Sequence, residues 1–157
     1  MIPTPSSICA LWDRTQIEEG VGIIGDTLGR AAIGAYQLQA AIAAIHDEAP
    51  SDDETDWPQI LALYDVLEQV SPGPVVTLNR AVTVAMVDGP RAGLAVLGTL
   101  DADDRMRHTH RLEAVRGHLL ELAGEPGAAR ESYRRAAMMT ASVPEQRYLA
   151  MRAARLR

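Results

Sequence analysis

The sequence predicts an all-α fold in which about eight helices pair into stacked helical hairpins. Ala and Leu dominate segments whose apolar residues recur every three or four positions, which is the spacing of one face of an α-helix. Residues that favour strands are scarce, because the 157-residue chain has no Phe, 2 Trp and 4 Tyr, and its β-branched runs are short. Pro and Gly interrupt the periodic segments and predict short connections between the helices.

The first two helices are expected at residues 13–28 and 35–48. Each has one apolar stripe, formed in the first by Ile17, Val21, Ile24 and Leu28, and in the second by Leu38, Ala41, Ile42 and Ile45. Three glycines weaken the first helix, whereas the second ends at a proline. We therefore expect the second helix to be the better defined of the two.

The third helix is expected to begin after Asp56 and to end at the Ser-Pro-Gly-Pro segment that starts at residue 71. Asp56, followed by Gln59 three residues later and by Pro58 in the first turn, is typical of a capped helix start. The acidic segment at residues 51–56 lacks the turn glycine and the terminal bidentate glutamate of a calcium loop. We interpret that segment as a solvated connection or as an acidic contact for a basic partner.

Five more helices are expected in the second half of the chain. Residues 75–87 and 90–100 are separated by a short Asp-Gly linker and are expected to form an antiparallel hairpin. An acidic loop at residues 101–104 precedes a sixth helix that extends to about residue 123. The last two helices are expected at residues 126–140 and from residue 144 to the end.

These helices repeat a pattern that is similar to the tetratricopeptide repeat (TPR), which has about 34 residues. The clearest copy comprises Gly117, Leu120, Gly124, Ala129, Tyr133 and Ala136, with Arg116 in place of the usual Leu and Ala141 in place of the usual Pro. Two earlier copies have equivalent residues at Ala41 and Tyr64, and at Ala81, Gly93 and Leu97. Small residues such as Gly117 and Ala129 would let paired helices approach closely, while Tyr133 fills the groove between them.

The repeat pattern predicts a single TPR-like domain over residues 1–157. Three hairpins at residues 35–141 would stack into an α–α superhelix, because each buries its apolar side against the next. Residues 1–34 would form an N-terminal capping region, and residues 142–157 a C-terminal capping helix. The alternative is an irregular helical bundle with accidental spacing.

Four strings carry a second similarity. They are Leu-Trp-Asp-Arg at residues 11–14, Gly-Ala-Tyr-Gln-Leu-Gln-Ala-Ala-Ile-Ala-Ala-Ile-His at 34–46, Thr-Asp-Trp at 55–57 and Val-Thr-Leu-Asn-Arg-Ala-Val at 76–82. Together they resemble the C-terminal extension of one group of extracytoplasmic-function (ECF) sigma factors of the sigma-70 family. The resemblance implies a TPR-like domain that regulates or supports N-terminal sigma regions, which bind core RNA polymerase and promoter DNA.

Most of the chain aligns with that extension, and no part resembles the promoter-binding sigma regions. The acidic Asp-Gly-rich segment that usually stands before the Trp-Asp-Arg string is also absent. We interpret the chain as a fragment, a degenerate relative or a truncated gene product of such a sigma factor.

Charge is distributed unevenly along the chain, whose net charge is −6. Residues 1–104 carry 4 Arg and 16 Asp or Glu, whereas residues 105–157 carry 11 Arg and 5 Glu. The basic end could meet nucleic acid, an acidic partner or the acidic half of its own chain, and charge alone does not choose among them. Nucleic-acid binding would rest on Arg130, Arg134, Arg135, Arg147, Arg152, Arg155 and Arg157.

Asn79 and Arg80 are the first candidate partner-binding residues, because they are polar exceptions on an otherwise apolar helix. Helical spacing places them beside the apolar stripe, where they could face the concave groove of the stack. Alternatively, Asn79 satisfies a neighbouring backbone group and Arg80 pairs with an acid such as Asp65 or Glu68.

Tyr36, Gln37 and Gln39 are the second group of candidates. They could form a polar shelf for a ligand, or they could serve helix capping and packing. Trp12 and Trp57 are interpreted as core residues rather than as binding platforms.

The histidines do not predict a metal site, and we expect no cofactor. His108 and His110 point to different faces of a helix, and only Glu113 could join His110 as a ligand. His46 ends a helix, where a cationic side chain is favourable. The sequence also lacks a nucleophile elbow, a phosphate loop, a dinucleotide fingerprint and a metalloprotease pair, so we expect no enzyme activity.

Taken with its single cysteine and its lack of a run of about 18 apolar residues, the sequence predicts a cytoplasmic protein without a membrane segment. We expect a regulatory protein-interaction domain that modulates transcription initiation through contacts with sigma regions or RNA polymerase. DNA would be reached only indirectly, through the missing sigma regions. The alternatives are direct nucleic-acid binding by the Arg-rich end, and a small-molecule or peptide signal bound in the groove.

Overall fold

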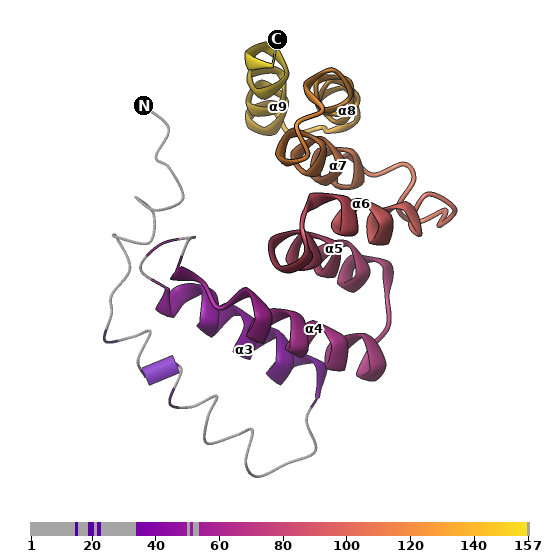
Figure 1. Cartoon of the computed structure of the whole chain (residues 1–157). Helices are drawn as coiled ribbons and strands as arrows, with labels where there is room; N and C mark the ends of the chain where they lie inside the picture. Colours follow the sequence, from indigo (N-terminus) through magenta and orange to yellow (C-terminus); the bar gives the residue numbers. More distant parts are fainter. Residues whose placement is uncertain are drawn as a thin grey trace. The chain divides into compact units, whose positions relative to one another are not determined.

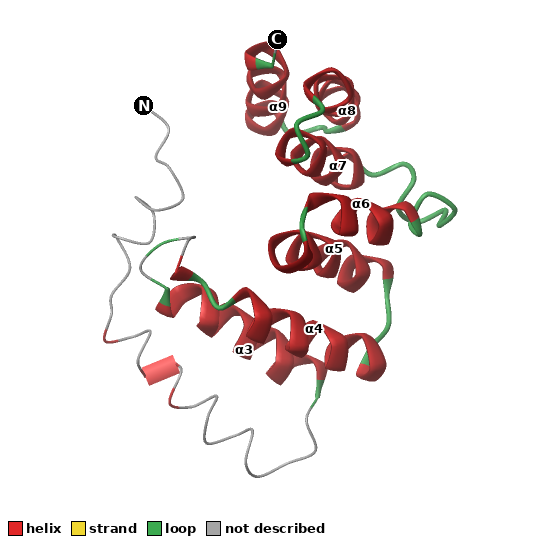
Figure 2. Ribbon diagram, viewed as in Figure 1, coloured by secondary structure: helices red, strands yellow, loops and turns green. Residues whose placement is uncertain are grey.

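The computed structural model describes residues 34–156 except Pro50, Asp52 and Asp53, together with Thr15, Glu19, Gly20 and Gly22. Seven helices lie within residues 34–156 (Figure 1), namely α3 (Ala35–Glu48), α4 (Trp57–Val70), α5 (Pro74–Asp88), α6 (Pro90–Gly98), α7 (His110–Leu122), α8 (Pro126–Met139) and α9 (Val143–Arg155). The described residues contain no strand (Figure 2), which confirms the predicted all-α fold of helical hairpins. The helix predicted at residues 13–28 lies largely outside the described residues.

The chain divides into two compact units, Met1–Ser71 and Pro72–Arg157. In the first unit α3 packs against α4, and in the second the pairs α5–α6, α6–α7, α7–α8 and α8–α9 are in contact. Within the described residues no helix is both long and apolar enough to cross a bilayer. The predicted single domain over residues 1–157 remains a prediction.

Local sequence signals determine where the helices of the first unit begin. The backbone N–H of Gly34 donates to Oε1 of Gln37 at 2.7 Å at the start of α3. Oδ1 of Asp56 accepts from the backbone N–H of Gln59 at 3.0 Å, as predicted for the start of α4, and Pro58 lies in the first turn. The start of α4 is therefore the one that the capping pattern predicts, and at the start of α3 Gln37 has the capping role that was one of its two interpretations.

The predicted apolar stripes supply the buried residues of the first unit. These are Leu38, Ala41 and Ile42 of α3 and Ile60 and Leu67 of α4. A ring contact also joins the end of α3 to the start of α4, because His46 lies edge-on to Trp57 with 5.1 Å between ring centroids.

In the second unit, close contacts at glycines bring paired helices together. A Cβ placed on Gly93 of α6 would lie 2.5 Å from the carbonyl oxygen of Ala81 and 2.5 Å from the Cβ of Ala85, both in α5. A Cβ placed on Gly117 of α7 would lie 2.8 Å from Cδ1 of Tyr133 in α8. Both hairpins therefore depend on the absence of a side chain at one position, as the repeat pattern predicts.

The predicted start of the sixth helix is wrong. The helix was expected directly after the acidic loop at residues 101–104, but α7 begins at His110. Turns occupy the intervening residues, because the backbone N–H of Met106 donates to the oxygen of Asp103 and that of Thr109 donates to the oxygen of Met106. The Met106 side chain is 4% exposed and belongs to the core shared with α5, α6 and α7, so tertiary packing holds this segment out of the helix.

Candidate functional site

A hollow opens in the second unit beside the first turns of α5 and α7 and the loop that leads into α7. Its volume is about 610 Å³, within the range of about 300–1,000 Å³ that is typical of ligand pockets. We call it the α5–α7 hollow. It is lined by Pro74, Val75, Leu78, Asn79, Arg105, Met106, His108, Thr109, His110, Arg111 and Met139.

The apolar part of the hollow combines core residues with exposed ones. Leu78 and Met106 are each 4% exposed and pack in the apolar core of the second unit. Val75 and Met139 are 52% and 37% exposed and present apolar surface to solvent. A bound apolar group would gain from covering this surface.

The polar part of the hollow is basic, since none of the lining residues is acidic. Arg105 donates to both carboxylate oxygens of Asp103, and Nε2 of His110 lies 3.2 Å from Oε2 of Glu145. Arg111 is exposed and makes no side-chain polar contact within the described part of the chain. The hollow therefore offers at least one uncommitted cation to an anionic ligand.

Asn79 and Arg80 differ in their relation to the hollow. Asn79 is exposed and lines it, whereas Arg80 is half-buried, has a polar partner and is not among the lining residues. The backbone oxygen of Asn79 accepts from the Thr83 hydroxyl one turn later.

Tyr36, Gln37 and Gln39 belong to α3 of the first unit, and none of them is among the lining residues of the hollow. Gln37 caps the N-terminus of its helix through the bond from Gly34. Tyr36 is 87% exposed, and Gln39 is also exposed.

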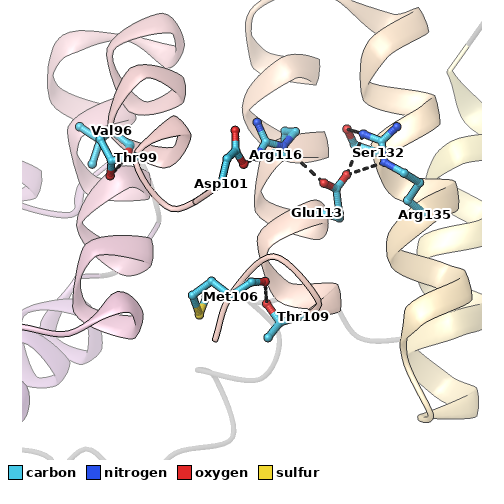
Figure 3. A network of polar contacts seen from close by, with 9 residues as sticks. All are labelled: Val96, Thr99, Asp101, Met106, Thr109, Glu113, Arg116, Ser132 and Arg135. Carbon is cyan, nitrogen blue, oxygen red and sulfur yellow. Dashed lines mark hydrogen bonds and ion pairs between the residues drawn. The ribbon is translucent and has the colours of Figure 1, made fainter. Parts of the chain in front are cut away.

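A network of ion pairs explains why an arginine stands at the usual leucine position of the repeat. Arg116 donates to Asp101 in the preceding loop and lies 3.6 Å from Oε1 of Glu113 (Figure 3). Oε2 of Glu113 also accepts from Nε of Arg135 at 2.9 Å, and Arg135 in turn donates to Ser132. The network ties the loop after α6 to α7 and α8.

A second polar cluster attaches α9 to the hairpin of α7 and α8. Oε2 of Glu121 accepts from the Tyr133 hydroxyl at 2.8 Å and from Nη2 of Arg152 at 2.5 Å. The Arg152 guanidinium also lies over the Tyr133 ring, 5.5 Å from its centroid, and donates to the Tyr148 hydroxyl. One arginine thus joins three helices.

This cluster shifts the pKa values of its members. Burial, and next the hydrogen bond to Glu121, raise the pKa of Tyr133. Burial alone would raise the pKa of Glu121, but hydrogen bonds from Arg152 and Tyr133 lower it below its ordinary value. His118 lies nearby, and its pKa is lowered first by burial and then by the charge of Arg152.

The arginines of the basic end are used in two ways. Arg135 and Arg152 are committed to carboxylates of α7, and Arg155 donates to the sulfur of Met151. Arg130, Arg134 and Arg147 make no side-chain polar contact within the described residues. Arg157 lies outside the described residues. The described residues also hold no group of three or more His, Cys, Asp or Glu that could bind a metal ion.

Sequence reasoning missed the hollow because it placed residues 105–109 in a helix. The signal was present, since residues 105–111 contain three Arg and two His directly after the acidic loop at residues 101–104. Only the turn around Met106 brings these residues beside α5.

The fold and its glycine contacts define the class of protein as an all-α protein of paired helical hairpins. The chain is 39% identical, over 141 residues, to a protein of Rhizobium meliloti (strain 1021) that is described as uncharacterized. This alignment covers 90% of the chain and 33% of the relative, so the chain spans about a third of the relative's length. No family model matches the chain, and no solved structure matches it.

Proposed function

We propose that the chain is the regulatory protein-interaction region of an ECF sigma factor, acting in the cytoplasm and without catalytic activity of its own. The observation that carries the proposal is the pair of glycine-dependent hairpins, in which Gly93 and Gly117 meet the neighbouring helix at the positions of the repeat pattern. Hairpin arrays of this kind present extended surfaces to other polypeptides. The four strings that resemble the sigma-factor extension direct the proposal to sigma regions or RNA polymerase as the partner.

The length of the Rhizobium relative is compatible with this assignment. About two thirds of that protein lie outside the alignment, which leaves room for regions that bind polymerase and promoter DNA. In this proposal DNA is reached only through such regions.

The test is co-purification of the tagged chain with separately expressed sigma regions, which are taken from the gene sequence upstream of it, and with core RNA polymerase. We expect retention of the sigma regions or of the polymerase. Sigma regions from a factor without such an extension are the control and should not be retained. Absence of sigma regions upstream, or loss of every contact in the co-purification, would overturn the proposal.

Direct binding of nucleic acid is the weaker proposal, and three arginines favour it, of which Arg134 and Arg147 are exposed and Arg130 is half-buried. Arg130, Arg134 and Arg147 are uncommitted within the described residues, whereas Arg135 and Arg152 are already ion-paired. Phosphate contacts by several arginines would make the affinity for DNA or RNA fall steeply with salt. A salt titration that shows no binding at low salt rejects this alternative.

A further inference from the structure

We propose that the α5–α7 hollow binds a short acidic peptide segment that carries an apolar side chain. The inference names the chemistry of the partner and therefore rests on the proposed protein-interaction function. It comes from the composition of the hollow, whose lining combines apolar residues, here called the floor (Val75, Leu78, Met106 and Met139), with basic residues, here called the rim (Arg105, His108, His110 and Arg111).

The floor accounts for the apolar side chain of the ligand. Val75 and Met139 lie at the hollow with 52% and 37% of their surface exposed, and Leu78 and Met106 continue the apolar surface into the core. Covering exposed apolar surface is favourable, at roughly 25 cal/mol for each Å² removed from water. A leucine or methionine side chain of the bound peptide would cover part of this apolar surface.

The rim accounts for the acidic residues. The rim consists of Arg105, His108, His110 and Arg111, and no carboxylate is among the lining residues. Asp103 and Glu145 engage Arg105 and His110 from outside the lining, which leaves Arg111 to meet a carboxylate from the ligand. Opposite charge across an interface selects the partner and speeds encounter.

The same composition disfavours a nucleic acid. Single-stranded nucleic acids bind through aromatic side chains that stack on the bases, together with a basic groove. The hollow has no Phe, Tyr or Trp among its lining residues. An acidic peptide with an apolar side chain fits both parts of the site, whereas a nucleic acid fits only the rim.

The test uses fluorescence anisotropy of the full chain with a labelled peptide, Asp-Glu-Asp-Glu-Leu-Leu-Asp-Glu-Asp-Glu. Two further peptides are compared, one with Asn and Gln in place of the acids and one with Ser in place of both leucines. We expect saturable binding of the first peptide and clearly weaker binding of both others. Equal binding of all three, or no binding of the first, would show the inference to be wrong.

Two pairs of matched variants locate the site. Arg111→Glu reverses an exposed charge at the rim, in the first turn of α7, where a glutamate is compatible with the helix dipole. Arg147→Glu makes the same change at an exposed arginine of α9 outside the hollow. We expect Arg111→Glu to lower the affinity for the acidic peptide about fivefold or more, and Arg147→Glu to change that affinity less than about twofold.

Val75→Ser and Val143→Ser form the second pair, because the two valines are 52% and 54% exposed and only Val75 lines the hollow. Val75→Ser should weaken binding and Val143→Ser should not. If the two variants of either pair lose peptide affinity equally, the peptide binds through non-specific charge or hydrophobic contacts. That result would refute the proposed site.

Binding of a labelled oligothymidine is measured in parallel. If the chain binds it more tightly than the acidic peptide, and Arg111→Glu weakens that binding, the hollow is a nucleic-acid site instead. The co-purification separates this inference from the proposed function. If the unmodified chain retains the sigma regions but does not bind the acidic peptide, the inference falls and the proposed function stands. If retention itself fails for the unmodified chain, the proposed function falls.

Discussion

The ring of Tyr133 lies directly over the backbone of Gly117, so that a Cβ at position 117 would be 2.8 Å from the ring carbon Cδ1. We expect Gly117→Ala to lower the free energy of unfolding by about 1–2 kcal/mol, because the ring must move and overpacking of a core typically costs about 1–3 kcal/mol. The gain in helix propensity from Gly to Ala offsets only part of this. Urea unfolding followed by circular dichroism measures it.

Gly127→Ala is the matched control, since a Cβ at that helical position would meet nothing within 4 Å. It should leave the stability unchanged or raise it by up to about 1 kcal/mol. If both variants unfold at the same urea concentration, the close contact between Gly117 and Tyr133 does not exist in solution.

Gly93→Ala should cost more than Gly117→Ala, at or above about 3 kcal/mol. Its Cβ would meet the carbonyl oxygen of Ala81 at 2.5 Å, and a backbone atom cannot rotate away as a side chain can. The hairpin of α5 and α6 would have to separate. The same urea titration ranks the two variants, and the reverse order would contradict this account.

The pair of Glu121 and Arg152 should show a measurable coupling energy. A double-mutant cycle with Glu121→Gln and Arg152→Met is expected to give about 1–3 kcal/mol, because the bond is charge-assisted and partly buried. The control cycle uses Arg91→Ala and Glu125→Ala, a pair separated by 3.9 Å whose side chains are 85% and 46% exposed. That pair should couple by less than about 0.5 kcal/mol, and similar values for the two cycles would remove the role assigned to Arg152.

Stability should decrease as the pH falls below about 6.5, and His118 should contribute to the decrease. Burial, followed by the charge of Arg152, lowers the pKa of His118 in the folded chain below its ordinary value of 6.5. As the pH falls, His118 is therefore protonated first in the unfolded chain. Its contribution to the free energy of unfolding is fully present above pH 6.5 and is lost as the pH falls through the pKa that His118 has in the folded chain.

Thermal unfolding between pH 7.5 and 5.5 compares the unmodified chain with His118→Gln. The melting temperature of the variant should fall less steeply with decreasing pH. His108→Gln is the control at an exposed histidine and should retain the full slope. If the melting temperature depends on pH in the same way in all three proteins, His118 does not contribute to the pH dependence of stability. Because the pKa of Glu121 is lowered from 4.5, that carboxylate stays ionised throughout this range.

Glu113 should matter more to stability than Arg116. Glu113→Gln leaves the guanidinium groups of Arg116 and Arg135 without their shared carboxylate, and we expect a loss of about 1–3 kcal/mol. Arg116→Leu restores the residue that the repeat pattern usually has and leaves Asp101, which is 56% exposed, in water. Its effect should stay within about 1 kcal/mol by chemical denaturation, and a larger loss than that of Glu113→Gln would contradict this ranking.

Much of the fold could be predicted because its signals are local. The helix expected at residues 35–48 is α3, and Asp56 caps α4 through Gln59 as the pattern indicates. Such features depend on a few neighbouring residues, which the sequence displays directly. The closeness of Gly117 to Tyr133 was also predictable, because a repeat pattern states which distant positions meet.

The start of α7 and the candidate site could not be predicted in this way. Residues 105–109 have no local signal strong enough to stop a helix, and they form turns because Met106 is drawn into a core shared with α5 and α6. The basic rim follows from that turn, so reasoning that assumed a helix missed it. Asn79, in contrast, was singled out from the sequence and lines the hollow, although its role in binding remains a prediction.

The sequence by itself therefore determined most of the helices, the cap of α4 at Asp56 and the small residues at which helices pair. Only the tertiary structure decided that Arg116 joins a carboxylate network, that Arg152 contacts residues of two other helices, and that two arginines and two histidines line one hollow together with apolar residues. The physical reason is how far apart in the sequence the interacting residues lie. Caps and apolar stripes depend on residues within a turn or two of each other, whereas the bond between Glu121 and Arg152 spans 31 residues and forms only once α7 and α9 are in place.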